Sequence, residues 1–227
     1  MDNDDFFDAF NDWDDLTQKR EQCLRCGRPT TVCICSHLPI DPIQLKRSRL
    51  HILQHPNEEN RPLHTVSILR SALHTDSCYV YKGKSFSQQK YPNLHQVFKA
   101  DNTVLLYPSK NATKLDDLKF NGCCNVVLVD GTWKQASSMF ARNPVLDTLT
   151  KVQIEAPSIS EYVVRTQPND KCLSTVECAA IALSHTEDDL NLKEVLLKPL
   201  RAMCQFQLNH GAVVHQSKEA VARSKMQ

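Results

Sequence analysis

The sequence predicts an α/β protein in which a mostly parallel sheet is flanked by helices. Short apolar runs rich in β-branched residues recur along the chain, and each has the length of a buried strand: 50–54, 78–81, 103–107, 126–129 and 151–154. Segments with the apolar spacing of helices alternate with these runs. Such alternation is typical of a parallel sheet that helices cover on its faces.

The chain is long enough to build one sizeable core. It has 227 residues, of which 41% are hydrophobic, and this suits a single domain with a small appendage. No apolar run approaches the length of a membrane span, and the first residues are acidic rather than typical of a secretion signal. We therefore expect a soluble intracellular protein with no membrane partner, in the cytosol, the nucleus or both.

The charge is distributed unevenly along the chain. Residues 1–22 carry eight acidic and two basic side chains, whereas 23–227 carry 25 basic and 18 acidic ones. The first segment therefore predicts an acidic, disordered tail. The moderately basic remainder is compatible with a polyanionic partner such as RNA, although a solvated surface explains most lysines equally well.

Four cysteines lie close together directly after the acidic segment. Cys23 and Cys26 form a C-x2-C pair, and Cys33 and Cys35 form a C-x-C pair. In an intracellular chain this set predicts one tetrahedral Zn²⁺ site within a small knuckle spanning 23–38. Such knuckles are usually structural, so the metal alone does not define a function.

The α/β core is predicted to span 45–208. The strand over 50–54 runs into a polar, proline-containing loop in which His55, Glu58 and Arg61 are candidate ligand contacts. A bonded surface loop is the alternative interpretation of these three residues. A helix is expected over 65–74, whereas 83–100 shows no clear pattern.

The next two strands each end in residues suited to ligand binding. The strand from 103 closes at Tyr107 and Pro108, and the strand over 126–129 runs directly into Asp130 and Gly131. Ligands of open parallel sheets bind beyond the carboxyl ends of the strands, which is where Asp130 stands. The sequence leaves a second interpretation open, in which this is a plain junction with Thr132 and Gln135 forming a capping box.

The last third of the chain combines a polar loop with two helices. A passage over 165–172 leads into an alanine-rich helix, where Ser174 and Glu177 have the spacing of a capping box and the first amides can hold an anion. An amphipathic helix is expected over about 188–208. Residues 209–227 are predicted to be a polar, frayed tail.

Several common enzyme classes are disfavoured by what the sequence lacks. It contains no G-x-G-x-x-G or P-loop motif, only five glycines, and neither H-E-x-x-H nor G-x-S-x-G. Dinucleotide, nucleoside-triphosphate and the common hydrolase sites are therefore not expected.

The ordered set of motifs resembles the DTW-domain family over about 23–208. The set comprises the two cysteine pairs, Gln54-His55-Pro56-x-Glu58-x-x-Arg61-Pro62, Leu106-Tyr107-Pro108, Asp130-Gly131-Thr132-Trp133 and Cys172-Leu173-Ser174-Thr175-x-Glu177. Family members are tRNA-uridine aminocarboxypropyltransferases, and the likeness is greatest to the second eukaryotic type. The resemblance implies a fold similar to the SPOUT methyltransferases, with a C-terminal trefoil knot.

The resemblance also implies a reaction and roles for the motif residues. The expected reaction moves the 3-amino-3-carboxypropyl group of S-adenosylmethionine to N3 of a tRNA uridine, with the D-loop as the expected region, and leaves 5′-methylthioadenosine. Asp130 is the candidate general base. The S-adenosylmethionine contacts are expected from Tyr107, Pro108, Gly131, Thr132, Trp133, Leu173, Ser174, Thr175 and Glu177. The tRNA contacts are expected from His55, Glu58, Arg61 and Arg165.

Alternative roles and functions remain open from the sequence alone. Trp133 suits a core position as well as a cavity wall, Arg165 suits the methionine carboxylate or a tRNA phosphate, and Ser174 with Glu177 can serve only as a helix cap. One alternative function is a SPOUT-like RNA methyltransferase. The other is a noncatalytic RNA-binding module built on the zinc knuckle. No pattern indicates an oligomeric state.

Overall fold

The computed structural model describes residues 21–59, 61, 63–120, 122–155 and 159–224. The acidic segment predicted over 1–22 lies outside these residues except for its last two positions.

The described residues form one six-stranded sheet in the order β2-β1-β5-β3-β6-β4. Every neighbouring pair is parallel, so the predicted α/β class is confirmed. The strands are β1 (Ser48–Gln54), β2 (Cys78–Lys82), β3 (Thr103–Leu106), β4 (Thr113–Lys114), β5 (Cys124–Asp130) and β6 (Thr150–Gln153). Strands β1 and β5 pair along their full length, and this register places Gln54 beside Asp130 at the carboxyl edge.

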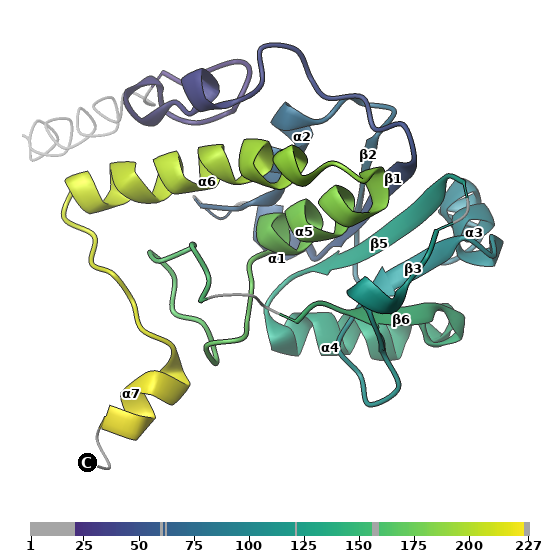
Figure 1. Cartoon of the computed structure of the whole chain (residues 1–227). Coiled ribbons are helices and arrows are strands. Elements are labelled where there is room, and N and C mark those ends of the chain that lie inside the picture. The colour runs from purple at the N-terminus through teal and green to yellow at the C-terminus, as the bar shows by residue number, and fades with distance from the viewer. Residues whose placement is uncertain (1–20, 60, 62, 121, 156–158, 225–227) are drawn as a thin grey trace, which may run out of the picture.

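Helices cover both faces of this sheet (Figure 1). The α-helices of the described residues are α1 (Pro56–Glu59), α2 (Val66–Ala72), α3 (Pro92–Lys99), α4 (Trp133–Arg142), α5 (Thr175–Glu187), α6 (Leu190–Asn209) and α7 (Lys218–Ser224). Helices α2, α5 and α6 pack in the core on one face, and α3 and α4 pack in the core on the other.

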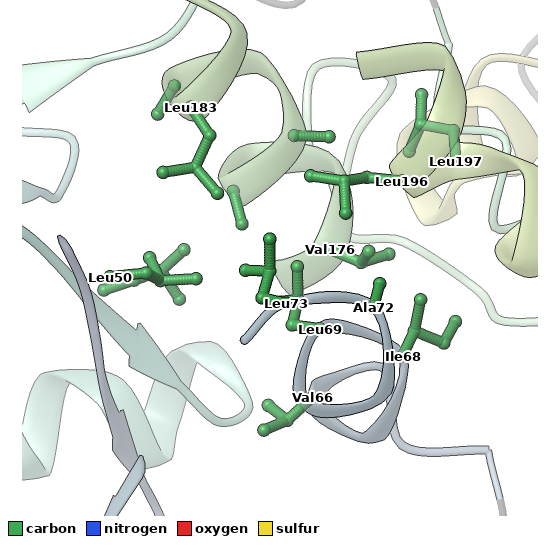
Figure 2. Packing of buried hydrophobic residues seen from close by; sticks show 14 of the residues in the cluster. Leu50, Val66, Ile68, Leu69, Ala72, Leu73, Val176, Leu183, Leu196 and Leu197 are labelled. Carbon is green, nitrogen blue, oxygen red and sulfur yellow. The ribbon is translucent and has the colours of Figure 1, made fainter. Parts of the chain in front are cut away.

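The apolar runs of the strands are continuous because both faces of the sheet are buried. Val126 and Leu128 contribute to the larger core with α2, α5 and α6, while Val127 between them contributes to the core with α3 and α4. This is the alternation of a pleated strand with a helix layer on each side. Figure 2 shows the larger core, where Leu50 of β1 lies near Leu69 and Leu73 of the α2 segment.

The alanines of α5 allow close packing of the helix layer. Ala179, Ala180 and Ala182 are fully buried, and α5 packs against α6 as well as against β5. A larger side chain at any of these sites would separate the layers or introduce strain.

Three segments differ from the sequence expectation. Residues 83–100 contain α3 in their second half, a short helix of eight residues that begins at Pro92 and buries Leu94 and Phe98 on one face. The loop after β1 contains the one-turn helix α1, where Pro56 occupies a first-turn position that needs no backbone N–H donor. The tail expected to fray contains α7, and its backbone bonds to the core from His215 N to Val163 O at 2.8 Å.

Two further expectations concern topology and membranes. The trefoil knot implied by the family resemblance stays a prediction. Across the described ranges, no helix combines the length and apolar character needed to cross a membrane.

Candidate active site

A cavity of about 410 Å³ lies at the carboxyl edge of the parallel sheet. Its wall includes Leu106 at the end of β3 and Asp130 at the end of β5, together with residues of the 165–168 loop and the first residues of α5. The cavity therefore lies where open parallel sheets bind their ligands.

Most of the predicted site residues converge on this cavity. Those that line it are Glu58, Tyr107, Pro108, Asp130, Gly131, Thr132, Trp133, Arg165, Leu173, Ser174 and Thr175. Three predicted residues are not among those lining it, namely His55, Arg61 and Glu177. The roles predicted for all of these residues stay predictions, and their positions constrain what each side chain can do.

The Asp130 carboxylate is buried and held from two sides. Its Oδ1 accepts a hydrogen bond of 2.6 Å from Thr175 Oγ1, and its Oδ2 accepts one of 3.0 Å from Gln54 Nε2. Its backbone carbonyl also accepts from the amide of His55 at 2.9 Å. These hydrogen bonds fix the orientation of the carboxylate. Because each carboxylate oxygen has two acceptor positions, the group can still accept a further hydrogen bond.

The residues after Asp130 begin α4 with the predicted capping box. The Thr132 hydroxyl accepts from the Gln135 amide at 3.3 Å, and Gln135 Oε1 accepts from the Thr132 amide at 2.6 Å. A Cβ atom at Gly131 would lie 3.1 Å from the Gln135 Cβ, so the box leaves little room for a side chain there. The local capping explanation is therefore correct, and it coexists with the cavity position of Asp130.

Trp133 lies on the wall of the cavity rather than in a core. The residue is 46% exposed and lines the cavity beside Asp130. The core alternative is therefore wrong. Its indole offers a flat apolar surface for a planar ligand group.

Glu177 connects α5 to the preceding loop and does not reach the cavity. Its Oε2 accepts from the amide and hydroxyl of Ser174 and from the hydroxyl of Ser160, and its Oε1 accepts from the amide of Glu161. The residue is only 3% exposed. These bonds account for a buried carboxylate in a supporting role, as the helix-cap interpretation predicts.

Glu58 lies between two arginines at the rim of the cavity. Its Oε1 is 3.1 Å from Arg61 Nε, and its Oε2 is 3.9 Å from Arg165 Nη2. Because the contact to Arg165 is long, the guanidinium of Arg165 keeps donors that can face the cavity. Arg61 lies on the other side of Glu58, in a neighbouring groove.

His55 has a local structural role. Its ring Nδ1 accepts a 3.2 Å hydrogen bond from the amide of Asn57, and the side chain is buried beneath Gly131. The ring therefore fixes the turn that begins α1.

Several cavity residues carried no motif that the sequence analysis could have used. His64 lines the wall, its Nδ1 is buried, and within the described part of the chain this atom has no hydrogen-bond partner. Burial lowers the pKa of His64, while the nearby Asp130 carboxylate acts in the opposite direction. Lys218 reaches the cavity from the C-terminal segment, where the sequence indicates only a polar tail.

The four cysteines of the knuckle form a site that fits one tetrahedral metal ion. The sulfur atoms of Cys23, Cys26, Cys33 and Cys35 all lie within 4.8 Å of one another. Two sulfur pairs are separated by 3.5 Å, Cys23 with Cys35, and by 3.7 Å, Cys26 with Cys33. Tetrahedral Zn²⁺ with Zn–S bonds of about 2.3 Å requires sulfur separations of about 3.8 Å. The set therefore suits zinc.

The knuckle is anchored to the core, and its cysteines differ in acidity. Backbone hydrogen bonds at Cys26 and Arg25 lower the pKa of Cys23 to about 6, whereas burial raises the pKa of Cys35. Gly27, with a positive φ of 68°, directly follows Cys26, and its amide donates to the carbonyl of Cys23 at 2.8 Å, which closes the turn that holds the first two cysteines. Ile34 is buried among residues of the larger core, so a metal here would also fix the knuckle against the domain.

The fold and the site together define an α/β protein with a cavity at the carboxyl edge of its sheet and a four-cysteine cluster that can hold a metal ion. Comparison with known families is more specific, because residues 20–208 match the DTW domain. The chain belongs to the DTW-domain family.

Curated relatives extend this assignment over most of the chain. The chain is 41% identical to tRNA-uridine aminocarboxypropyltransferase 2 of Mus musculus, over 91% of this chain and 70% of the relative. It is 39% identical to the protein of the same name in Drosophila melanogaster, over 99% of this chain and 90% of the relative. It is 26% identical to tRNA-uridine aminocarboxypropyltransferase A of Arabidopsis thaliana, over 88% of this chain and 85% of the relative. No solved structure gives a significant match.

Proposed function

We propose that this protein is a tRNA-modifying transferase that moves the 3-amino-3-carboxypropyl group of S-adenosylmethionine to N3 of a tRNA uridine. We propose the D-loop as the location of that uridine. Membership of the DTW-domain family and the names of the relatives support the transferase class. The observation that carries the proposal furthest is the buried, doubly hydrogen-bonded Asp130 on the wall of a ligand-sized cavity.

The cavity residues suit a zwitterionic nucleoside such as S-adenosylmethionine. A volume of about 410 Å³ lies within the range of small-molecule sites. Trp133, Pro108 and Leu106 offer apolar surface for the adenine, and Arg165 offers a cation for the methionine carboxylate. Asp130 and Glu58 offer negative charge for the ammonium and sulfonium groups. The donor set therefore fits.

Asp130 is suited to accept the proton that the uridine must lose. S-adenosylmethionine supplies a positively charged sulfonium, which makes its attached carbons electrophilic and leaves as a neutral thioether. Uridine N3 forms a bond to the transferred carbon, the carbon–sulfur bond breaks, and its electron pair stays on sulfur. The N3 proton goes to Asp130, whose orientation Thr175 and Gln54 fix in advance.

The choice between the aminocarboxypropyl and methyl groups is a matter of position. Both groups are bonded to the same sulfonium, so the chain selects one by holding it in line with the uridine. Arg165 is the residue we assign to this task, because a bidentate contact to the methionine carboxylate would fix the transferred chain at the rim of the cavity.

Isotope labelling tests the proposed reaction. The purified chain is incubated with unmodified tRNA and with S-adenosylmethionine labelled either in the methionine carboxyl carbon or in the methyl group, and the tRNA nucleosides are analysed by mass spectrometry. We expect the carboxyl label to enter uridine, with release of 5′-methylthioadenosine. Entry of the methyl label alone would instead establish a methyltransferase. Binding of tRNA without either label would establish a noncatalytic module.

A further inference from the structure

A second groove, of about 720 Å³, lies between the zinc knuckle and α2. Four arginines line it, Arg25 and Arg28 from the knuckle, Arg61 from the loop after α1, and Arg70 from α2. The acidic side chain on its wall is Glu59, which forms an ion pair with Lys82. The groove therefore has a strong excess of positive charge.

The arginines of this groove are not all neutralised by the protein itself. Within the described ranges, Arg28 and Arg70 form no ion pair, and Arg28 is only 7% exposed. The Nε of Arg28 donates to the carbonyl of Val32 at 3.1 Å, which holds the guanidinium in the knuckle. Arg25 is held through hydrogen bonds to the carbonyls of Pro39 and Ile40. Because these hydrogen bonds already hold Arg25 and Arg28 in the groove, their guanidinium groups need no large rearrangement to bind an anion.

The groove adjoins the candidate active site. His64 lines both the groove and the cavity. Arg61 in the groove contacts Glu58, which lines the cavity, at 3.1 Å. A chain-like ligand that lies in the groove would therefore pass next to the cavity that Asp130 and Trp133 line.

We propose that this arginine groove binds the phosphodiester backbone of the tRNA substrate, so that the zinc knuckle is part of the substrate-binding surface. This inference rests on the proposed function. The positive charge of the groove matches a polyanion. S-adenosylmethionine has no phosphate, and Arg165 and Lys218 at the cavity are available for its carboxylate. Arginine forms bidentate contacts with phosphate oxygens, and several arginines contributed by three segments suit a backbone with regularly repeated phosphates.

The test compares arginine variants of the full chain with a matched control. The variants are Arg25→Gln, Arg70→Gln and the double variant, all at exposed positions. The control is Arg142→Gln, an exposed arginine on α4, which packs on the opposite face of the sheet. Zinc content and thermal melting establish that each variant is folded. Affinity for labelled tRNA is then measured without S-adenosylmethionine over a range of salt concentrations.

We expect each single groove variant to bind tRNA about tenfold more weakly than the wild-type chain, and the double variant to bind more weakly than either. The slope of log affinity against log salt should fall by about 0.7 for each lost phosphate contact. In the transfer reaction, KM for tRNA should rise while kcat and the affinity for S-adenosylmethionine stay unchanged. Arg142→Gln should match the wild-type chain in all of these measurements.

Two outcomes would overturn the proposal. One is a folded double variant with the tRNA affinity and salt dependence of Arg142→Gln. The other is displacement of tRNA by polyglutamate at equal charge concentration, which would indicate an acidic protein partner instead. Because binding is measured without the donor, groove-dependent tRNA binding with no transfer would contradict the proposed reaction and leave the groove assignment intact.

Discussion

The hydroxyl of Thr175 donates a 2.6 Å hydrogen bond to Oδ1 of Asp130, which joins the first residue of α5 to the last residue of β5. The two residues are 45 positions apart in the sequence. With Gln54 on the other carboxylate oxygen, this bond fixes the plane of the group that we assign as general base.

Replacement of Asp130 by Asn should abolish most of the transfer activity while the fold is kept. The amide occupies the same volume and can retain a hydrogen bond to Thr175, but it cannot take the N3 proton. Single-turnover transfer to tRNA should slow by about 100-fold or more. Thr175→Val is the companion variant, because it keeps the carboxylate and removes one of its positioning bonds. It should slow transfer less than Asp130→Asn does, and equal loss in both variants would contradict the general-base role.

Trp133 should report directly on occupation of the cavity. Because its indole is half-exposed on the cavity wall, addition of S-adenosylmethionine should change the tryptophan fluorescence, and Trp133→Phe should remove this change. Trp133→Ala should weaken S-adenosylmethionine binding about fivefold by calorimetry, since an aromatic contact contributes roughly 1 kcal/mol. Trp133→Phe should bind almost as well as the wild-type chain, and unchanged binding by Trp133→Ala would show that the indole does not contact the donor.

The knuckle should contain one zinc ion per chain. Elemental analysis of reduced, freshly purified protein should give a ratio near one, because the sulfur positions match a tetrahedral site. Cys35→Ser should reduce the zinc content and lower the melting temperature, since metal binding here contributes to folding. Cys123→Ser is the matched control, an exposed cysteine outside the cluster. Loss of zinc from both variants alike would argue against the four-cysteine site.

Glu177 should contribute to stability rather than to the reaction. The Glu177 carboxylate accepts hydrogen bonds from the surrounding amides and hydroxyls. In Glu177→Gln the side-chain NH2 group faces these donors and cannot accept from them, so the substitution should lower the free energy of unfolding by about 2–3 kcal/mol. Urea unfolding measures this change. The control is Glu194→Gln, an exposed partner of Arg201, which should cost less than about 1 kcal/mol. Equal effects of the two substitutions would mean that the Glu177 bonds contribute little.

His51 should make the stability depend on pH. The ring lies buried in β1 between the side chains of Tyr79 and Asn125, and burial lowers its pKa to about 4 from an ordinary value of 6.5. The His51 ring binds a proton more readily in the unfolded chain than in the folded one. The contribution of the neutral ring to the free energy of unfolding is therefore complete above about pH 6.5 and is lost as the pH falls towards 4. The loss between about pH 7.5 and pH 5 should be about 2 kcal/mol.

The His51 contribution is measured by urea unfolding at both pH values. His51→Gln cannot titrate, so its loss of stability over the same interval should be smaller by this amount. An identical pH dependence in both proteins would assign the effect to other groups, such as the cysteines of the knuckle.

Local sequence determined much of the framework of this protein. The apolar runs predict the main strands because both faces of a parallel sheet are buried, and the capping boxes at 132–135 and 174–177 predict where α4 and α5 begin. These are interactions between residues a few positions apart, so a pattern within one short window is sufficient to reveal them. The cysteine spacing predicts the metal cluster for the same reason.

Only the tertiary structure decided which residues share the cavity. The order β2-β1-β5-β3-β6-β4 places Gln54 beside Asp130, and no local pattern defines that order. His64 and Lys218 reach the cavity from segments without any motif. From the sequence alone, Trp133 suits a core position and a cavity wall equally well, because the exposure of its side chain depends on which segments pack against α4. Convergence of distant segments is a property of the packed sheet and helices, and packing is not encoded in any single stretch of the chain.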